Sequence, residues 1–284
     1  MKKYTHAWLA FMAIKRLEYA PMPDKYKEYA TSLVAWFKDH RDAVVQDSWY
    51  PDEVFKDMAT SHVLKYTPGE EYRIVKFKSL PKGLKLTDYG KQSKCYKVPY
   101  TIENGNGPDR CEAISHSIVD NLKIMYMEEK GSPIIPSGNH IALRFYILSH
   151  YIVDLHMPLH CDSRSFSSYS NIHGYIEDQW EKQVNTSYVL DKTSERFFYD
   201  AAGYPLKSEK PSVLTEAVEK EIITRDFIFD WGSGNNNAYD YMNAITQYSY
   251  LTAYHLIPAE HKPKTLTKTI FKSLDFWKNR WADT

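Results

Sequence analysis

The stretch from residue 140 to residue 156 constrains the fold of this 284-residue chain most strongly. Its apolar residues cover nearly the whole circumference of a helix, which is typical of a helix buried at the centre of a bundle. Two ionisable residues, His150 and Asp154, interrupt this apolar surface four positions apart and therefore share one helix face. Because a lone buried charge costs several kcal/mol, the pair predicts polar partners on neighbouring elements.

Helical periodicity recurs along most of the remaining chain. An N-terminal helix is expected over residues 5–17, with Thr5 as its N-cap and His6 facing inward, and Pro211 is expected at the first position of a later helix. The further helices are predicted over residues 26–37, 48–62 with a break at Pro51, 111–129, 140–156, from about 173, 211–229, 238–257 and 265–281. Residues 67–110 lack this pattern and are expected to form a long irregular excursion, either a loop or a small hairpin. Because strand-like alternation is scarce, the sequence predicts an all-α fold in a single domain spanning residues 1–284.

Composition and charge exclude several classes of protein. The 36 basic residues balance 36 acidic residues, which argues against a broadly basic nucleic-acid coat. No stretch reaches the roughly 20 uninterrupted apolar residues that a membrane-spanning helix needs, and the first residues carry no signal-peptide pattern. We therefore expect a soluble protein that is cytoplasmic as written. The three cysteines include no Cys-x-x-Cys pair, so neither a disulfide framework nor a thiolate zinc site is indicated.

A second pair of ligand-type residues, His173 and Glu177, repeats the same spacing on the next predicted helix. Pro158 ends the helix before it, which lets His160 turn back beyond that helix terminus. A single pair of this kind is common as a surface ion pair, whereas two such pairs close together, one on an apolar helix, favour a metal site. Asp178 competes with Glu177, but it points about 140° away from His173. Imidazole and carboxylate ligands without thiolates suit zinc, and manganese or iron less well.

Residues 150–160 read His-Tyr-Ile-Val-Asp-Leu-His-Met-Pro-Leu-His. This run resembles the His-Phe-x-Gly-Asp-x-x-x-Pro-Leu-His signature of the zinc-dependent phospholipases C and the single-strand-specific nucleases. Asn171-x-His173, followed by an acid four residues on, is similar to their next motif. In the N-terminal half, Ser-Trp-Tyr-Pro-Asp-Glu over residues 48–53 resembles the nucleases' Ser-Trp-Ala-Asp-Glu with one insertion, and His62 stands where that superfamily places its next histidine.

The resemblance implies an almost entirely helical phosphoesterase that holds three zinc ions. Carried over by position, the ligands of one zinc would be Asp52, His62, His150 and Asp154. The ligands of a second zinc would be His160, His173 and Glu177. A third zinc would be held by the free terminus of Met1, where the family has Trp, by His6 and by a bridging Asp154. Asp47 is the alternative to Asp52, because its separation from His62 also occurs in the family.

The resemblance also implies an activity, namely the hydrolysis of phosphate diesters by a zinc-bound hydroxide, with Asp52 orienting that water or acting as general base. Phospholipids and single-stranded nucleic acids are both candidate substrates, and the lysines and aromatic residues of the excursion over residues 67–110 suit either one. Two other functions stay open. One is a phosphomonoesterase or 3'-nucleotidase on the same scaffold, and the other is a non-catalytic protein with a structural metal site. The family is usually secreted, whereas this N-terminus shows no signal sequence.

Overall fold

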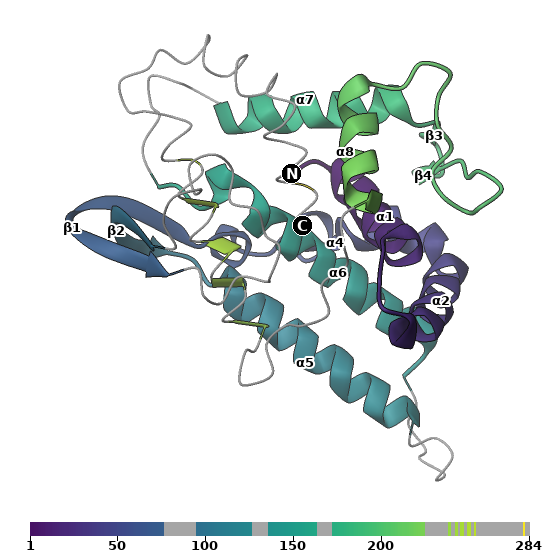
Figure 1. Cartoon of the computed structure of the whole chain (residues 1–284), viewed down its shortest axis with the longest axis horizontal. Helices are drawn as coiled ribbons and strands as arrows, with labels where there is room; N and C mark the ends of the chain where they lie inside the picture. Colours follow the sequence, from purple (N-terminus) through teal and green to yellow (C-terminus); the bar gives the residue numbers. More distant parts are fainter. Residues whose placement is uncertain are drawn as a thin grey trace.

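The computed structural model describes residues 1–76, 95–126, 136–163 and 172–224, together with scattered positions between 238 and 281. Over these residues the chain is mostly helical (Figure 1). The α-helices are α1 (Lys3–Tyr19), α2 (Asp24–Asp39), α3 (Val44–Asp47), α4 (Tyr50–Glu53), α5 (Gly107–Tyr126), α6 (Gly138–His156), α7 (Ile172–Ser187) and α8 (Val213–Thr224). Short 3-10 turns lie at Arg41–Ala43, Ala59–His62 and Pro158–His160. The strands form two antiparallel pairs, β1 (Lys65–Lys76) with β2 (Cys95–Asn104) and β3 (Leu190–Asp191) with β4 (Arg196–Phe197).

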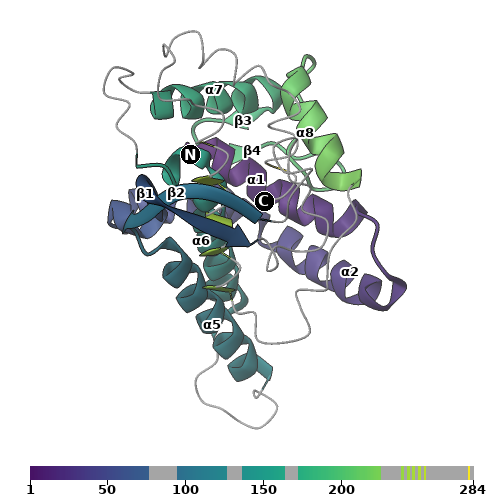
Figure 2. The same ribbon diagram turned by 60° about the vertical axis from the view of Figure 1, so that its left-hand side comes forward.

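Helix α6 lies at the centre of the described structure. None of its residues from 141 to 156 is exposed, and the side chains of His150 and Asp154 are buried. Helix α5 runs along one side of α6, while α1 and α3 contact it elsewhere (Figures 1 and 2). This arrangement confirms the predicted central helix, because a helix with neighbours on several sides needs an apolar surface all round.

Helix α1 is nearly as buried as α6, although its sequence predicts only one apolar face. Every residue from 5 to 12 is buried, and the ring of Trp8 stacks on that of Trp180 in α7 with centroids 5.9 Å apart. His6 is fully buried, which confirms its predicted inward orientation. Helices α1, α6 and α7 therefore enclose a common interior, and the polar residues within it must satisfy one another.

Two predicted helix starts are wrong. Helix α1 begins two residues before Thr5, so Thr5 lies inside the first turn and is not the N-cap. Helix α8 begins two residues after Pro211, so this proline precedes the helix and does not occupy its first position. The Oγ of Ser212 accepts a hydrogen bond from the backbone N–H of Leu214 at 3.2 Å. A serine side chain therefore caps α8, as is usual where first-turn amides lack partners.

The helix predicted over residues 48–62 is broken into short pieces. Helix α4 carries Pro51 in its first turn and ends at residue 53. Lys56 follows with a φ of +46°, in the left-handed region that an α-helix does not contain. The chain then forms the 3-10 turn that ends at His62. This reversal brings Asp52 and His62 together, with a carboxylate oxygen of Asp52 3.7 Å from Nε2 of His62.

Residues 67–76 and 95–104, the described parts of the expected excursion before α5, lie in the two arms of a hairpin and not in an irregular loop. The register runs from the pair Lys65–Asn104 to the pair Lys76–Cys95, with irregularities between residues 65 and 66 and between residues 67 and 72. Helix α5 begins at residue 107, four residues earlier than predicted. The hairpin was one of the two forms that the sequence allowed, and the structure decides between them.

Two close backbone approaches hold the base of this hairpin. Gly105 has a φ of +125°, and a Cβ at this position would lie 2.1 Å from the carbonyl oxygen of Val63. Only glycine permits this conformation and this approach. The backbone N–H of Tyr66 donates to the carbonyl of Cys161 at 3.0 Å. The base of the hairpin is thereby held against Val63 and Cys161, which directly follow His62 and His160 in the chain.

Parts of the sequence predictions lie outside the described residues. These include Asn171 of the family-like motif and most of the helices predicted over residues 238–257 and 265–281, although the described positions within both ranges are helical. Within the described part of the chain, no helix combines the length and the apolar composition needed to cross a membrane. Cys111 and Cys161 are both buried.

Candidate metal centre

Histidine and carboxylate side chains from separate segments meet where α1, α6 and α7 converge. The N-terminus lies between α6 and α7 in both overall views (Figures 1 and 2). In each of three groups of residues, the potential ligand atoms all lie within 4.8 Å of one another. These groups are His6–Asp52–His150, His62–His150–Asp154 and His160–His173–Glu177. All eight side chains predicted as ligands therefore meet at one place, and the grouping of His6 with Asp52 and His150 was not foreseen.

Asp154 lies at the middle of the site, and its two carboxylate oxygens face different partners. Oδ1 is 2.9 Å from the α-amino nitrogen of Met1 and 3.4 Å from Nε2 of His6. Oδ2 is 2.9 Å from Nδ1 of His62 and 3.2 Å from Nε2 of His150. Burial acts to raise the pKa of Asp154, but the nearby ammonium and imidazoles outweigh it and hold this pKa well below its usual range. Asp154 is therefore an anion placed between two sets of nitrogen donors.

Backbone carbonyls orient two of the imidazoles. Nδ1 of His150 lies 2.8 Å from the carbonyl oxygen of Ser48, and Nδ1 of His160 lies 3.2 Å from that of His62. A carbonyl only accepts hydrogen bonds, so in the neutral rings Nδ1 carries the proton and Nε2 presents a lone pair. The lone pair of His150 then faces Oδ2 of Asp154. The same nitrogen also lies 3.0 Å from Nδ1 of His62, so it faces both a carboxylate and a second imidazole. The carbonyl contact of Nδ1 is typical of metal-binding histidines.

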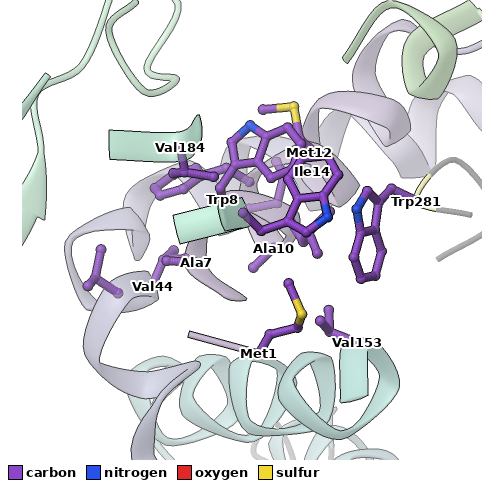
Figure 3. Close-up of a cluster of buried hydrophobic side chains, with 14 of the residues drawn as sticks. Met1, Ala7, Trp8, Ala10, Met12, Ile14, Val44, Val153, Val184 and Trp281 are labelled. Carbon is purple, nitrogen blue, oxygen red and sulfur yellow. The ribbon is translucent and has the colours of Figure 1, made fainter. Parts of the chain in front are cut away.

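The α-amino group of Met1 is fully buried and lies 2.9 Å from Asp154 and 2.8 Å from Oε1 of Glu177. Burial disfavours its ammonium form, but the attraction of the two carboxylates exceeds this effect and raises the pKa of the amine to about 10. The Met1 side chain lies in the hydrophobic core beside Val153 of α6 (Figure 3). The first residue is therefore fixed both by its amine and by its side chain.

His6 is buried without a conventional partner for its ring. The ring stacks on His150, with centroids 4.1 Å apart and an interplanar angle of 18°. Among the described residues, neither ring nitrogen of His6 makes a hydrogen bond. Burial, together with the neighbouring His150 ring and the N-terminal ammonium, lowers the pKa of His6 far below its usual value, so the ring is neutral. A buried polar group left unsatisfied costs about 1–3 kcal/mol, and a metal ion bound to Nε2 would remove that cost.

The third group lies nearer the surface. Nε2 of His173 is 2.8 Å and Nε2 of His160 is 3.4 Å from Oε1 of Glu177. Burial acts to raise the pKa of Glu177, but its contacts with His160 and His173 and the nearby Met1 ammonium outweigh this effect and hold the pKa far below its usual range. Asp178 is 63% exposed and contacts Lys2 at 3.5 Å. The helix geometry that favoured Glu177 over Asp178 therefore agrees with the structure.

Asp52, and not Asp47, lies among the donor groups. One carboxylate oxygen of Asp52 is 3.7 Å from Nε2 of both His62 and His150. Asp47 is buried and belongs to none of the three groups, and burial raises its pKa to about 6. His156 is likewise buried and belongs to none of the three groups.

Sequence reasoning missed residues that hold the site from outside. Glu181 accepts hydrogen bonds from the first turn of α1, and its position four residues after Glu177 is the only local signal for that role. Asp57 accepts a 2.6 Å hydrogen bond from the hydroxyl of Tyr151 and lies 3.1 Å from the guanidinium of Arg110. These contacts join residues far apart in the chain, so periodicity carries no sign of them.

Comparison of the chain with protein-family models, with curated proteins and with solved structures found no match. Buried imidazole and carboxylate groups at these separations can hold metal ions. A bound cation would also account for the unsatisfied ring of His6, so the residues present fit a metal centre.

Proposed function

We propose that this protein is a zinc-dependent hydrolase of phosphate diesters, of the phospholipase C and single-strand nuclease type that its motifs resemble. The main support is the divided environment of Asp154, whose two oxygens face two separate sets of nitrogen donors. A carboxylate shared in this way suits two metal ions about 3.5–4 Å apart, as enzymes use for in-line displacement at phosphorus. The third donor group adjoins this pair through Glu177, which contacts the amine of Met1.

The donor set fits three zinc positions in number and type. The first would be held by Asp52, His62, His150 and Asp154, the second by His160, His173 and Glu177, and the third by Met1, His6 and Asp154. Bound zinc supplies a water of lowered pKa and neutralises charge on the phosphate oxygens. The protein contributes fixed donors, since carbonyls hold the Nδ1 protons of His150 and His160 and leave their Nε2 atoms for the metal.

Asp52 is the residue best placed to handle a proton during hydrolysis. Its side chain is 35% exposed, whereas those of Asp154 and Glu177 are largely buried. An attacking water or a substrate phosphate can therefore reach its free oxygen, and the carboxylate can orient that water and accept its proton. Asp154 and Glu177 stay anionic between imidazoles and are much less exposed to solvent water, at 3% and 12%, so they are assigned to the metal positions only.

The surroundings of Asp52 favour a phospholipid over a nucleic-acid backbone. Three apolar side chains follow it in the chain and are well exposed, Val54 by 56%, Phe55 by 46% and Met58 by 68%. Backbone hydrogen bonds hold them in place, since the N–H groups of residues 54 and 55 both donate to the carbonyl of Tyr50 at 2.9 Å. An apolar edge next to the site suits acyl chains and their interface with water. The side chains of residues 67–104 lie outside the described part of the chain.

The first test measures zinc content by plasma mass spectrometry together with turnover of bis-p-nitrophenyl phosphate. Wild type should contain close to three zinc ions per chain and turn over the diester. The variant His160→Ala should lose zinc and at least about 100-fold in activity. His116→Ala is the matched control, because this histidine is exposed and lies outside the three groups. Wild-type protein that binds no zinc, even after zinc is added, would refute the proposal.

The second test separates the substrates. The same protein is offered phosphatidylcholine vesicles, a single-stranded oligodeoxynucleotide and a 3'-nucleotide, and the release of head group, mononucleotide or inorganic phosphate is measured. The proposal expects cleavage of a diester, with the vesicles as the better substrate. Release of phosphate from the 3'-nucleotide alone would replace it with the phosphomonoesterase function. Three bound zinc ions without any hydrolysis would indicate a structural metal site.

A further inference from the structure

Glu181 caps the first turn of α1 from a different helix. Its Oε1 accepts a hydrogen bond from the backbone N–H of Tyr4 at 3.0 Å. Its Oε2 accepts from the N–H of Thr5 and from the hydroxyl of Thr5, both at 2.9 Å. First-turn amides have no acceptor within their own helix, and Lys2 in the N-cap position provides no side-chain cap. The carboxylate of Glu181 also lies at the positive end of the helix dipole. Helix α7 therefore supplies the cap that α1 lacks.

The turn held by Glu181 is the one that presents two of the donors described above. The amine of Met1 lies directly before it and His6 directly after its capped amides. Glu177, one helical turn before Glu181 on α7, lies 2.8 Å from the same amine. Helix α7 thus holds the start of α1 with two carboxylates, one on the amine and one on the backbone.

We propose that Glu181 is a positioning residue, which fixes the Met1 amine and His6 and thereby controls loading of the metal position that they share with Asp154. This inference rests on the proposed function. Metal ligands must be placed within a few tenths of an ångström, and the first turn of a helix frays when its amides lose their acceptors. Glu181 contributes no donor atom to the three groups, so it acts only through the turn that it caps.

The rest of α1 does not depend on this cap. Trp8 stacks on Trp180, and further along the helix Lys15 forms an ion pair with the buried carboxylate of Glu219 in α8. Loss of Glu181 should therefore loosen the first turn and leave the helix body in place. Glu219 offers a matched control, because it is also a glutamate that joins another helix to α1, but at a point remote from the donors.

The first measurement uses metal-free protein and needs no enzymatic activity. Hydrogen–deuterium exchange of the first-turn amides of α1 is compared among wild type, Glu181→Gln, Glu181→Ala and Glu219→Gln. Exchange at Tyr4 and Thr5 should be about tenfold faster in Glu181→Ala. It should be intermediate in Glu181→Gln, which keeps one acceptor oxygen, and unchanged in Glu219→Gln. Equal exchange in all four proteins would overturn the capping role.

The second measurement is the zinc retained by the same proteins at increasing chelator concentration. One zinc of three should dissociate at about 10–100-fold lower chelator concentration in the Glu181 variants, while the other two behave as in wild type and in Glu219→Gln. Three zinc ions with wild-type retention in both Glu181 variants would overturn the inference and leave the proposed function intact. A wild type without zinc would instead overturn the proposed function, and the inference with it, whatever the exchange result. If Glu181→Ala is unstable, the milder Glu181→Gln variant tests the selective loss of one zinc. The thermal midpoint of Glu219→Gln, read beside its zinc retention, shows whether a general loss of stability has the same effect.

Discussion

The substitution Asp47→Asn should stabilise this protein at neutral pH and leave its metal content unchanged. Asp47 is buried at the end of α3, and burial raises its pKa from 3.8 to about 6. At about 1.4 kcal/mol for each tenfold change in proton affinity, this difference corresponds to about 3 kcal/mol. At pH 7.5 the folded protein therefore holds an ionised carboxylate in a place that favours the neutral acid. A neutral amide of the same shape removes that cost, with about 3 kcal/mol as the upper limit because the amide must itself be desolvated.

The pH dependence of this effect has a definite sign. Because the folded state binds the proton of Asp47 more tightly than the unfolded state, protonation favours folding. The contribution of Asp47 to stability is most favourable below about pH 4 and is lost as the pH rises through about 6. The gain in the Asp47→Asn variant should therefore be largest at pH 7.5 and should vanish near pH 4.

Urea unfolding followed by tryptophan fluorescence at pH 4, 5, 6 and 7.5 measures this difference, and plasma mass spectrometry measures zinc in the same samples. Asp42→Asn is the control, because Asp42 precedes α3 but is exposed, and it should change the free energy of unfolding by less than about 0.5 kcal/mol. A destabilised Asp47→Asn variant at pH 7.5 would refute the reasoning about burial. Loss of one zinc would show that Asp47 is itself a zinc ligand.

Three further changes to the chain, one insertion and two sets of substitutions, test other parts of the structure. One extra glycine before Met1 should break both contacts of the buried amine, remove one zinc from mass spectrometric counts and cost about 3–5 kcal/mol in urea unfolding; an extended protein with full zinc would contradict this. Gly105→Ala places a Cβ against the carbonyl of Val63 at positive φ and should destabilise the protein by at least about 2 kcal/mol in the same assay, whereas a wild-type unfolding midpoint would argue against that contact. The double change Phe55→Ser and Met58→Ser should weaken sedimentation with phosphatidylcholine vesicles at least about tenfold and leave turnover of bis-p-nitrophenyl phosphate unchanged; equal vesicle binding would remove the argument for a lipid substrate.

Local patterns predicted the helices that depend on a sustained apolar face. Helices α6 and α7 were expected to begin within two residues of their observed starts, because period and flanking breaks are properties of the chain itself. The spacing of His150 with Asp154 and of His173 with Glu177 likewise placed each pair on one helix face. The predicted start of α1 was wrong because the cap of this helix comes from another helix. The preference for Thr at N-caps, applied to Thr5, considers only neighbouring residues and cannot detect such a cap.

The sequence by itself determined which residues carry donor atoms, which of them share a helix face, and that a buried central helix with charged residues needs partners. Only the tertiary structure decided that Asp52 and not Asp47 reaches the donors, that the excursion pairs as a hairpin, and that Glu181 holds the turn between Met1 and His6. The physical reason is the distance along the chain over which each kind of interaction acts. Helix periodicity acts over a few residues, whereas the contacts of Asp154 with Met1 and His62 join positions more than 90 residues apart in the chain, and their geometry exists only when the chain packs together.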